Sequence, residues 1–428
     1  MRLGLHGLTT RGRSFVAAGG AAVVCAVLFG QRDLLRVGVL VLVLPLLCAV
    51  VVARTRFRLS SSRRLEPARL AVGSDAKVVL RLENVSRLPT GVLLAEDRIP
   101  YLLGTRPRFV LERVEPRGTR EVEYPVHCEV RGRYPIGPLS IRLTDPFGMC
   151  ELERAFASRD VLVVTPVVQP LPWVALGGEW AGSGESRSRS LAAAGEDDVA
   201  TREYRQGDDL RRVHWRSTAR HGELMVRREE QPWESRAVLL LDTRAGAHRG
   251  DGPTSSFEAA VSVAASVGVH LGRGGFSVDL VTDTGARLGG AGGDDPGGSQ
   301  DDQLLDALAV LEPSYGSSLR PAARTLRHAG DGLTVAVLAA LTPEEAEDLV
   351  RVRHGAGAAV AVLLDVDTWR SPSDVAARAQ QPVDLDGPTA VLRGAGWRVV
   401  PLRIGEPLAQ VWPFAGHGGS AFAAGVRR

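Results

Sequence analysis

Lysine is almost absent from this chain of 428 residues, in which arginine supplies nearly all of the positive charge. The single lysine, Lys77, follows an alanine, so the chain lacks the Gly-Lys-Ser/Thr sequence of a phosphate-binding loop. We therefore do not expect a P-loop ATPase. The many alanine, glycine and valine residues indicate a GC-rich coding bias, so the number of arginines alone says nothing of function.

Other recognisable catalytic motifs are missing as well. The sequence contains no H-E-x-x-H, G-x-S-x-G or C-x-x-C motif, and its formal net charge is only +3 at pH 7. A charge this small does not create the long-range field that attracts nucleic acid. We therefore expect no enzyme activity, no cofactor and no nucleic-acid partner.

Cysteine is also scarce, with four residues in the whole chain. That number is too small for a disulfide scaffold. Cys25 and Cys48 lie in apolar segments, where a free cysteine packs as a small hydrophobic residue. Cys128 and Cys150 could form a disulfide if their domain were extracellular, but we expect both to be reduced and buried.

Residues 1–60 are predicted to form a transmembrane helical hairpin. Two uncharged, mostly apolar runs of 17 residues, 14–30 and 37–53, are joined by the short loop 31–36. Each run is at the short end of what spans a hydrocarbon core about 30 Å thick. A cleaved signal peptide is the alternative for the first run, but no A-x-A-like site follows it and the second run comes at once.

The arginines around the hairpin predict its orientation. Three precede the first run and five follow the second, whereas the loop carries two. Because basic residues flanking membrane helices favour the cytoplasmic side, we expect a multi-pass protein of the cell membrane with cytoplasmic soluble domains. The flanking arginines are Arg2, Arg11, Arg13, Arg54, Arg56, Arg58, Arg63 and Arg64, and those of the loop are Arg32 and Arg36.

Residues 61–165 are predicted to form a β-sandwich domain of the immunoglobulin-like kind. Apolar and polar residues alternate over 77–82, 121–130 and 139–143, which is typical of half-buried antiparallel strands. Turn sequences separate these runs, and roughly six or seven short strands in about a hundred residues suit such a sandwich. Residues 166–200, rich in Pro, Gly, Ser and Ala, are expected to be a flexible linker.

Residues 201–235 hold an unusual density of charge around Trp215. Eight arginines sit among six acids over residues 202–231. Because arginine forks pair with carboxylates in fixed geometry, we interpret the segment as an ion-paired structural plug or a partner-docking surface. A solvated charged surface is the alternative. The excess of only two positive charges argues against nucleic-acid binding.

The segment resembles the signature of the bacterial family called domain of unknown function 58. The pattern is Y-x-x-G-D-D-x-R-x-x-x-W-x-x-x-A-R-x-G-x-L-x-V-R. The resemblance implies a membrane protein with a von Willebrand factor A-like C-terminal domain, working beside MoxR-type AAA+ ATPases and transglutaminase-like membrane proteins, without a defined activity. The matching residues are Tyr204, Gly207, Asp208, Asp209, Arg211, Trp215, Ala219, Arg220, Gly222, Leu224, Val226 and Arg227.

Within this segment we expect a short helix from about Asp208 to Gly222, with Trp215 as a buried anchor. Our hypothesis is that Arg220 is buried against Asp208 or Asp209, while Arg216 faces a partner. The candidates for signature or docking residues are Tyr204, Gly207, Asp208, Asp209, Arg211, Trp215, Arg216, Arg220, Gly222 and Arg227.

Residues 236–428 are predicted to form the von Willebrand factor A-like domain, an α/β fold with a doubly wound sheet. Apolar strand-like runs alternate with helical patterns, which implies such a sheet. The sequence from Thr342 to Glu345 predicts a helix start, with an N-cap and a capping glutamate. The strands are expected at about 237–241, 276–281, 334–339, 358–364 and 397–402, and other helices at about 256–271, 302–312 and 318–328.

Asp242 ends the first of these strands, at the edge of the sheet where ligands bind. The von Willebrand factor A domain implied by the resemblance holds a metal there through D-x-S-x-S. Here Arg244 and Gly246 replace both serines. We expect no metal at this degenerate site, and Asp242 to pair with Arg244 or to cap nearby backbone. Asp365, another strand-end acid, is expected to be a structural cap.

The sequence therefore favours a membrane-anchored, non-enzymatic scaffold or adaptor. Its cytoplasmic α/β domain would meet a partner, for which the resemblance suggests a MoxR-type AAA+ ATPase. The alternative is an enzyme of unknown type that uses Asp208, Asp209, His214 and His221 as acid–base groups.

Overall fold

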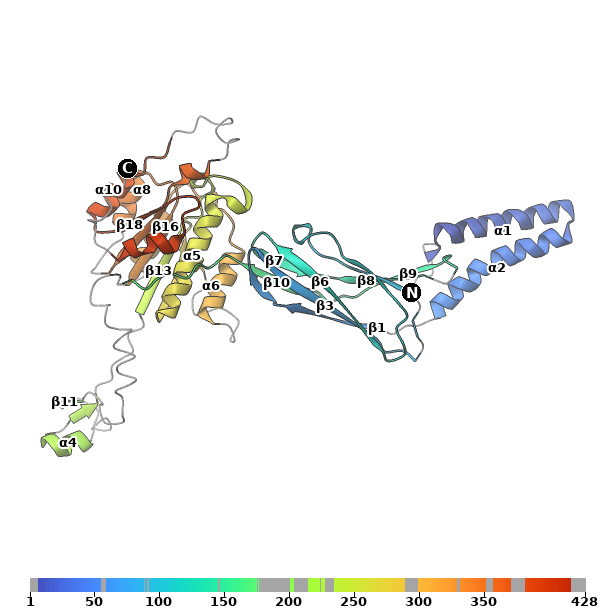
Figure 1. Cartoon of the computed structure of the whole chain (residues 1–428), viewed down its shortest axis with the longest axis horizontal. Coiled ribbons are helices and arrows are strands. Elements are labelled where there is room, and N and C mark those ends of the chain that lie inside the picture. Colours follow the sequence, from blue (N-terminus) through green and yellow to red (C-terminus); the bar gives the residue numbers. More distant parts are fainter. Residues whose placement is uncertain are drawn as a thin grey trace. The chain divides into compact units, whose positions relative to one another are not determined.

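The computed structural model divides the chain into two compact units, Met1–Thr165 and Pro166–Arg428 (Figure 1). The residues that it describes are 7–54, 59–87, 89, 90, 92–144, 147–174, 176, 201–203, 215–223, 225–227, 235–288, 299–328, 332–351, 357–370 and 382–416.

The first unit begins with two apolar helices, α1 (Thr10–Phe29) and α2 (Arg32–Arg54), which lie side by side (Figure 1). The Thr9 side chain accepts a hydrogen bond from the Gly12 amide and caps α1, and Gly30 ends it with a left-handed φ of 64°. Both helices are long and apolar enough to cross a membrane, as the two apolar runs predicted.

The rest of the first unit is rich in β-structure. The alternating runs predicted as strands lie in β3 (Ser74–Asn84), β6 (Thr119–Cys128) and β8 (Leu139–Thr144), because their apolar side chains face a common core. Three sheets are present in the described part, with strand orders β1-β3-β6, β2-β10-β7 and β5-β4-β8-β9. The remaining strands are β1 (Leu59–Glu66), β2 (Arg69–Ala71), β4 (Leu93–Asp97), β5 (Arg108–Leu111), β7 (Gly132–Ile136), β9 (Glu151–Ala155) and β10 (Asp160–Thr165).

A buried ion group joins strands of this unit. Arg63 of β1 donates from Nη2 to Asp97 Oδ1 at 2.7 Å and from Nη1 to Asp160 Oδ2 at 2.9 Å. The Tyr124 hydroxyl donates to Asp97 Oδ2 at 2.6 Å. The buried Asp97 carboxylate therefore has hydrogen-bond partners on both oxygens, as a buried charge requires.

The beginning of the expected linker is instead packed on the second unit. The Gln169 amide donates to Ser266 Oγ at 2.9 Å, and the Gln169 side-chain oxygen accepts from the Leu408 amide at 3.1 Å. The Trp173 ring lies 4.3 Å from the His270 ring, centroid to centroid. Residues 166–174 and 176 therefore form a strap, and the prediction of a flexible linker is wrong there because these contacts fix the chain. The other residues of 166–200 lie outside the described part.

The second unit is built on a six-stranded sheet of order β15-β14-β13-β16-β17-β18. The five strands β13 (Ser235–Leu241), β14 (Phe276–Thr282), β16 (Leu333–Leu338), β17 (Ala359–Leu364) and β18 (Arg398–Leu402) are parallel. These are the strands that the apolar runs predicted. The short edge strand β15 (Arg287–Leu288) is antiparallel to β14, which the sequence pattern did not predict.

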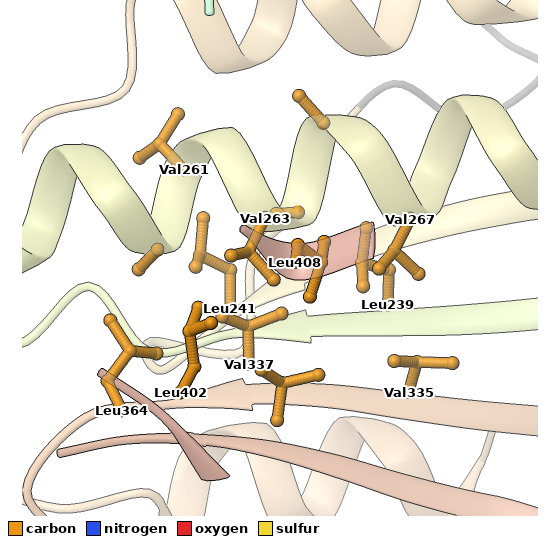
Figure 2. Packing of buried hydrophobic residues seen from close by; sticks show 14 of the residues in the cluster. Leu239, Leu241, Val261, Val263, Val267, Val335, Val337, Leu364, Leu402 and Leu408 are labelled. Carbon is orange, nitrogen blue, oxygen red and sulfur yellow. The ribbon is translucent and has the colours of Figure 1, made fainter. Parts of the chain in front are cut away.

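Apolar side chains cover both faces of this sheet, as its uninterrupted apolar strands require. On one face Val263 and Val267 of α5 (Ser256–Arg273) pack with Leu239 and Leu241 of β13 (Figure 2). On the other face Leu240 packs in a second cluster with α7 (Arg320–Arg327), α8 (Pro343–Val350) and α10 (Asp386–Gly394). Further helices of this unit are α6 (Gln300–Ala309) and α11 (Leu408–Val411).

The cysteines agree with most of what their positions predicted. Cys128 and Cys150 are buried and form no disulfide, and Cys48 is buried as well. Cys25 is exposed on the apolar helix α1.

Candidate functional site

Three strands of the sheet in the second unit end in an aspartate. Asp242 follows β13, Asp283 follows β14 and Asp365 follows β17. Because these strands are parallel, their carboxyl ends meet at one edge of the sheet, where ligands of such folds bind. Asp242 and Asp283 are completely buried, so each must have an internal partner.

The partner of Asp242 is Arg244. The guanidinium donates from Nε to Asp242 Oδ1 and from Nη2 to Oδ2, each at 2.9 Å. The two side chains are 6% and 0% exposed, so the pair is screened from water. Oδ1 also accepts the Arg244 amide at 3.1 Å, and Oδ2 accepts the Ala339 amide at 3.4 Å. The expected Asp242–Arg244 pair is therefore present, and both carboxylate oxygens are engaged.

Arg244 also contacts a second carboxylate, that of Glu345. Its Nη1 donates to Glu345 Oε1, and its Nη2 donates to the carbonyl oxygen of Ala340 at 3.1 Å. Burial opposes the charge on Arg244, but the hydrogen bonds and the charges of Asp242 and Glu345 outweigh it. They hold the pKa of the guanidinium above its ordinary value.

Glu345 has a structural duty besides this ion pair. Its Oε2 accepts the Thr342 amide at 3.1 Å, and its own amide donates to Thr342 Oγ1 at 3.3 Å. This is the capping box predicted for α8. The two oxygens of one carboxylate thus connect the start of α8 to the edge of the sheet, a link that the sequence did not reveal.

Asp283 is held by hydroxyl groups rather than by a cation. Thr243 donates its hydroxyl to Asp283 Oδ1, and Ser314 donates its hydroxyl to Oδ2 at 2.6 Å. The segment around Ser314 is itself fixed by Thr243, whose carbonyl accepts the Ser314 amide at 2.7 Å. Our sequence prediction missed Asp283, although its position directly after an apolar strand is the signal that identified Asp242.

His248 closes the inner side of the site. Its Nε2 lies 2.9 Å from the Asp242 carbonyl oxygen, which can only accept, so Nε2 carries a proton. Its Nδ1 lies 3.1 Å from Ser256 Oγ, which accepts the Arg249 amide and donates its own proton to Nδ1. Every hydrogen bond is thus satisfied by the neutral ring. Burial lowers the pKa of His248, which also favours the neutral ring.

Asp365 lies in a more open part of the same edge. Its carboxylate accepts from Arg403 Nε at 3.2 Å. It precedes the short 3-10 helix Val366–Trp369, but its side chain makes no capping hydrogen bond there. The expectation that Asp365 is a cap is therefore wrong, because the carboxylate pairs with Arg403 instead.

These residues do not fit the divalent cation that a D-x-S-x-S site would hold. Both oxygens of Asp242 are occupied by Arg244 and by backbone amides, and a guanidinium stands where the first hydroxyl ligand would be. Within the described part of the chain, no group of three or more His, Cys, Asp or Glu side chains could hold a metal ion. Because the Asp242 carboxylate is engaged by the Arg244 cation within the protein, it offers no open ligand position to a metal ion.

The signature segment forms a small element of its own. Strand β11 (Thr201–Glu203) pairs antiparallel with β12 (Met225–Arg227), and α4 (Trp215–His221) lies between them in sequence. The helix ends at Gly222, which has φ of 76° and donates its amide to the Thr218 carbonyl at 2.9 Å. The predicted stop at Gly222 is thereby confirmed.

The structure corrects two expectations about this segment. Trp215 is 69% exposed and therefore no buried anchor. Arg220 is exposed too, so it is not buried against an acid. The other signature candidates fall outside the described part: Tyr204, Gly207, Asp208, Asp209 and Arg211 entirely, and Arg216 and Arg227 in their side chains. The same holds for His214 and the side chain of His221.

The chain thus combines two apolar N-terminal helices, a β-rich remainder of the first unit and an α/β unit. The acids at the strand ends of the α/β unit have hydrogen-bond partners within the protein. Residues 200–367 match the family described as "Protein of unknown function DUF58". This match confirms the resemblance to that family which the signature predicted. No match is found among curated proteins.

Similar solved structures resemble about a quarter of the chain. The crystal structure of the CARDB domain of the PF1109 protein from Pyrococcus furiosus is 12% identical, covering 25% of this chain and 93% of that one, with a TM-score of 0.19. The C-terminal domain of wzt is 14% identical, covering 27% and 81%, with a TM-score of 0.20. TM-scores this low carry no further conclusion.

Proposed function

We propose that this protein is a membrane-anchored, non-enzymatic scaffold or adaptor that presents its α/β unit to a partner protein. The apolar hairpin would span the cell membrane as a two-helix anchor. The arginines flanking it favour a cytoplasmic position for both units. The candidate partner is a MoxR-type AAA+ ATPase, and a transglutaminase-like membrane protein is a second candidate. Both come from the family resemblance.

The folds that we assign to the two units in this proposal have topological support. The order β15-β14-β13-β16-β17-β18, with an antiparallel edge strand and helices on both faces, suits a von Willebrand factor A-like domain. The mostly antiparallel sheets packed on one core in the first unit suit an immunoglobulin-like sandwich. Both are folds on which binding surfaces are commonly built.

A non-enzymatic role is supported by the state of the acids at the sheet edge. A catalytic carboxylate needs an oxygen that can reach a substrate. Asp242 instead has both oxygens engaged, and Asp283 is held by two hydroxyl groups. The hydrogen bonds of these acids are suited to keep the carboxyl edge of the sheet rigid. A rigid edge favours recognition of a partner protein by shape.

The exposure of Trp215 is the main support for docking to a partner protein. This tryptophan is 69% exposed on α4, and Arg220 is exposed on the same helix. Tryptophan and arginine are the residues most enriched at the energetic centres of protein interfaces. An exposed tryptophan within the family signature is therefore best explained as a contact for another protein.

The test is capture of an AAA+ ATPase from detergent-solubilised membranes by the tagged full-length chain. Wild type and Trp215→Ala are compared with Trp173→Ala, which removes another tryptophan, 67% exposed, outside the signature. A tryptophan at the centre of an interface contributes at least about 2 kcal/mol, or roughly 30-fold in affinity. We expect Trp215→Ala alone to lose the ATPase. Equal capture by all three proteins would contradict the proposal.

A further inference from the structure

The turn between β8 and β9 packs against both helices of the apolar hairpin. Thr9, which caps α1, donates its amide to the Met149 carbonyl at 2.9 Å and its hydroxyl to the Gly148 carbonyl at 2.6 Å. On the other helix, the Cys150 thiol lies 3.7 Å from the carbonyl oxygen of Pro45. Contacts to two helices fix this turn firmly to the hairpin.

The packing at this junction is close. A Cβ atom on Gly12 would lie 2.2 Å from the Met149 carbonyl oxygen, so only glycine fits there. Met149, Cys150 and Cys48 form a separate apolar cluster, which Leu8, Leu44 and Ala49 extend. Together with the hydrogen bonds of Thr9, this cluster joins the β-rich part of the first unit to the hairpin.

The pairing of the two helices gives the level of the junction along the hairpin. Gly19 of α1 packs against Leu42 of α2. Because the helices are antiparallel, Gly12, seven residues earlier in α1, is level with Ala49, seven residues later in α2. Ala49 still belongs to the apolar run 37–53, while Gly12 stands between two arginines. The turn thus meets the hairpin where apolar sequence gives way to charge.

The turn carries an aromatic ring at this level, flanked by basic side chains. Phe147 is 60% exposed, although it lies next to a buried apolar cluster. Arg11 and Arg13 are exposed on α1, and Arg11 Nη1 lies 3.8 Å from the place where a Cβ on Gly148 would stand. Aromatic rings beside arginines are typical of segments at the boundary between acyl chains and headgroups.

We propose that residues Phe147–Cys150 form a third membrane contact of this protein, in addition to its two helices. The Phe147 ring enters the headgroup region of the bilayer, and Arg11 and Arg13 meet anionic headgroups beside it. This inference rests on the proposed function in one respect, namely that the hairpin spans a membrane. The contact would hold the β-rich part against the bilayer, so the chain would present its partner-binding surface from a fixed base.

Photo-crosslinking to lipid tests this contact on the full-length chain. The photo-reactive residue p-benzoylphenylalanine is placed at position 147, at Leu28 on the exposed surface of α1, or at Tyr101. Tyr101 is 86% exposed and follows Asp97, which pairs with Leu139 at the end of β8 remote from the turn. Each protein is reconstituted into vesicles of phosphatidylcholine and phosphatidylglycerol, irradiated and analysed for lipid adducts by mass spectrometry.

We expect lipid adducts at positions 147 and 28 and none above background at position 101. Adducts at 28 without adducts at 147 would overturn the third contact and leave the membrane anchor intact. Absence of adducts at both 28 and 147 would overturn the anchor and the contact together. Adducts at 101 as strong as those at 147 would also contradict the proposal, because labelling would then not be specific to the turn.

Discussion

Arg244 donates a hydrogen bond to each carboxylate oxygen of Asp242, from Nε to Oδ1 and from Nη2 to Oδ2, at 2.9 Å in each case. Two residues separated by a single position in the sequence therefore neutralise each other at the carboxyl edge of the sheet. The third member, Glu345, lies 101 positions from Arg244 and ties the pair to the start of α8. The Arg244 guanidinium, a cation supplied by the chain itself, thus closes the carboxyl edge of the sheet.

Replacing Arg244 should destabilise the protein strongly. In Arg244→Gln the buried Asp242 loses its cation, and breaking a buried pair in this way costs about 3–5 kcal/mol. Arg403→Gln is the matched control, because Arg403 pairs with Asp365 while 69% exposed, and such pairs contribute about 0–1 kcal/mol. Denaturant unfolding of the full chain in detergent measures both. Equal losses in the two variants would show that the Asp242–Arg244 pair is not the stabilising element.

Trp215→Ala should leave the free energy of unfolding within about 0.5 kcal/mol of wild type, as for other exposed residues. The control is Trp412→Ala, since Trp412 is completely buried in the core of the same unit and its loss should cost about 3–5 kcal/mol. Thermal unfolding of both variants decides the point. A loss at Trp215 as large as at Trp412 would mean that Trp215 is a structural anchor after all.

His248 should make stability depend on pH in the acidic range. Burial lowers its pKa in the folded state below the unfolded value of about 6.5. As pH falls below about 6.5, the unfolded chain takes up a proton that the folded chain refuses, so the free energy of unfolding decreases. The decrease ends once the pH passes below the folded pKa.

The variant His248→Gln keeps a side-chain donor for the Asp242 carbonyl but cannot titrate. As the pH is lowered from about 6.5, the free energy of unfolding of this variant should therefore fall less steeply than that of wild type. Burial lowers the pKa of His270 as well, so part of the slope should remain in the variant. Identical slopes in wild type and variant, measured by denaturant unfolding across this range, would refute the assignment of a neutral His248.

Gly12→Ala should weaken the contact between the hairpin and the β8–β9 turn. The added Cβ would meet the Met149 carbonyl at 2.2 Å, so the turn must move away from α1. Gly20→Ala is the control in the same helix, because nothing lies within 4 Å of its added Cβ. Alanine is favoured over glycine in helices by about 1 kcal/mol, so Gly20→Ala should be neutral or stabilising.

These two glycine variants are compared by thermal unfolding of the first unit. Protease sensitivity of the detergent-solubilised chain is the readout of unfolding. We expect a lower unfolding temperature for Gly12→Ala only. If both variants behaved as wild type, the close approach of Met149 to α1 would be absent from the protein in solution.

Local patterns predicted much of the fold. The alternation of apolar and polar residues identified β3 and β6, because in a strand the side chains of successive residues point to opposite faces. The sequence Thr342 to Glu345 likewise predicted the start of α8, since a capping box depends only on residues three positions apart. The Asp242–Arg244 pair was within reach of the sequence for the same reason.

What the sequence could not reveal depends on contacts between distant segments. Proline and glycine content made residues 166–176 look like a linker, but Trp173 packs on His270, almost one hundred positions away. Trp215 was expected to be buried because large aromatic residues usually are, yet its side chain is exposed on α4. The junction of Met149 with Gly12 has no sequence signal at all.

Magnesium titration of the full-length chain in detergent, by calorimetry, tests most directly whether Arg244 closes the sheet edge. Wild type is compared with Asp242→Asn, which removes the charge of the central carboxylate. We predict no saturable heat in wild type near physiological magnesium concentration and the same trace for the variant. Saturable binding by wild type that Asp242→Asn abolishes would instead show that the sheet edge holds an open metal site, which Arg244 does not close.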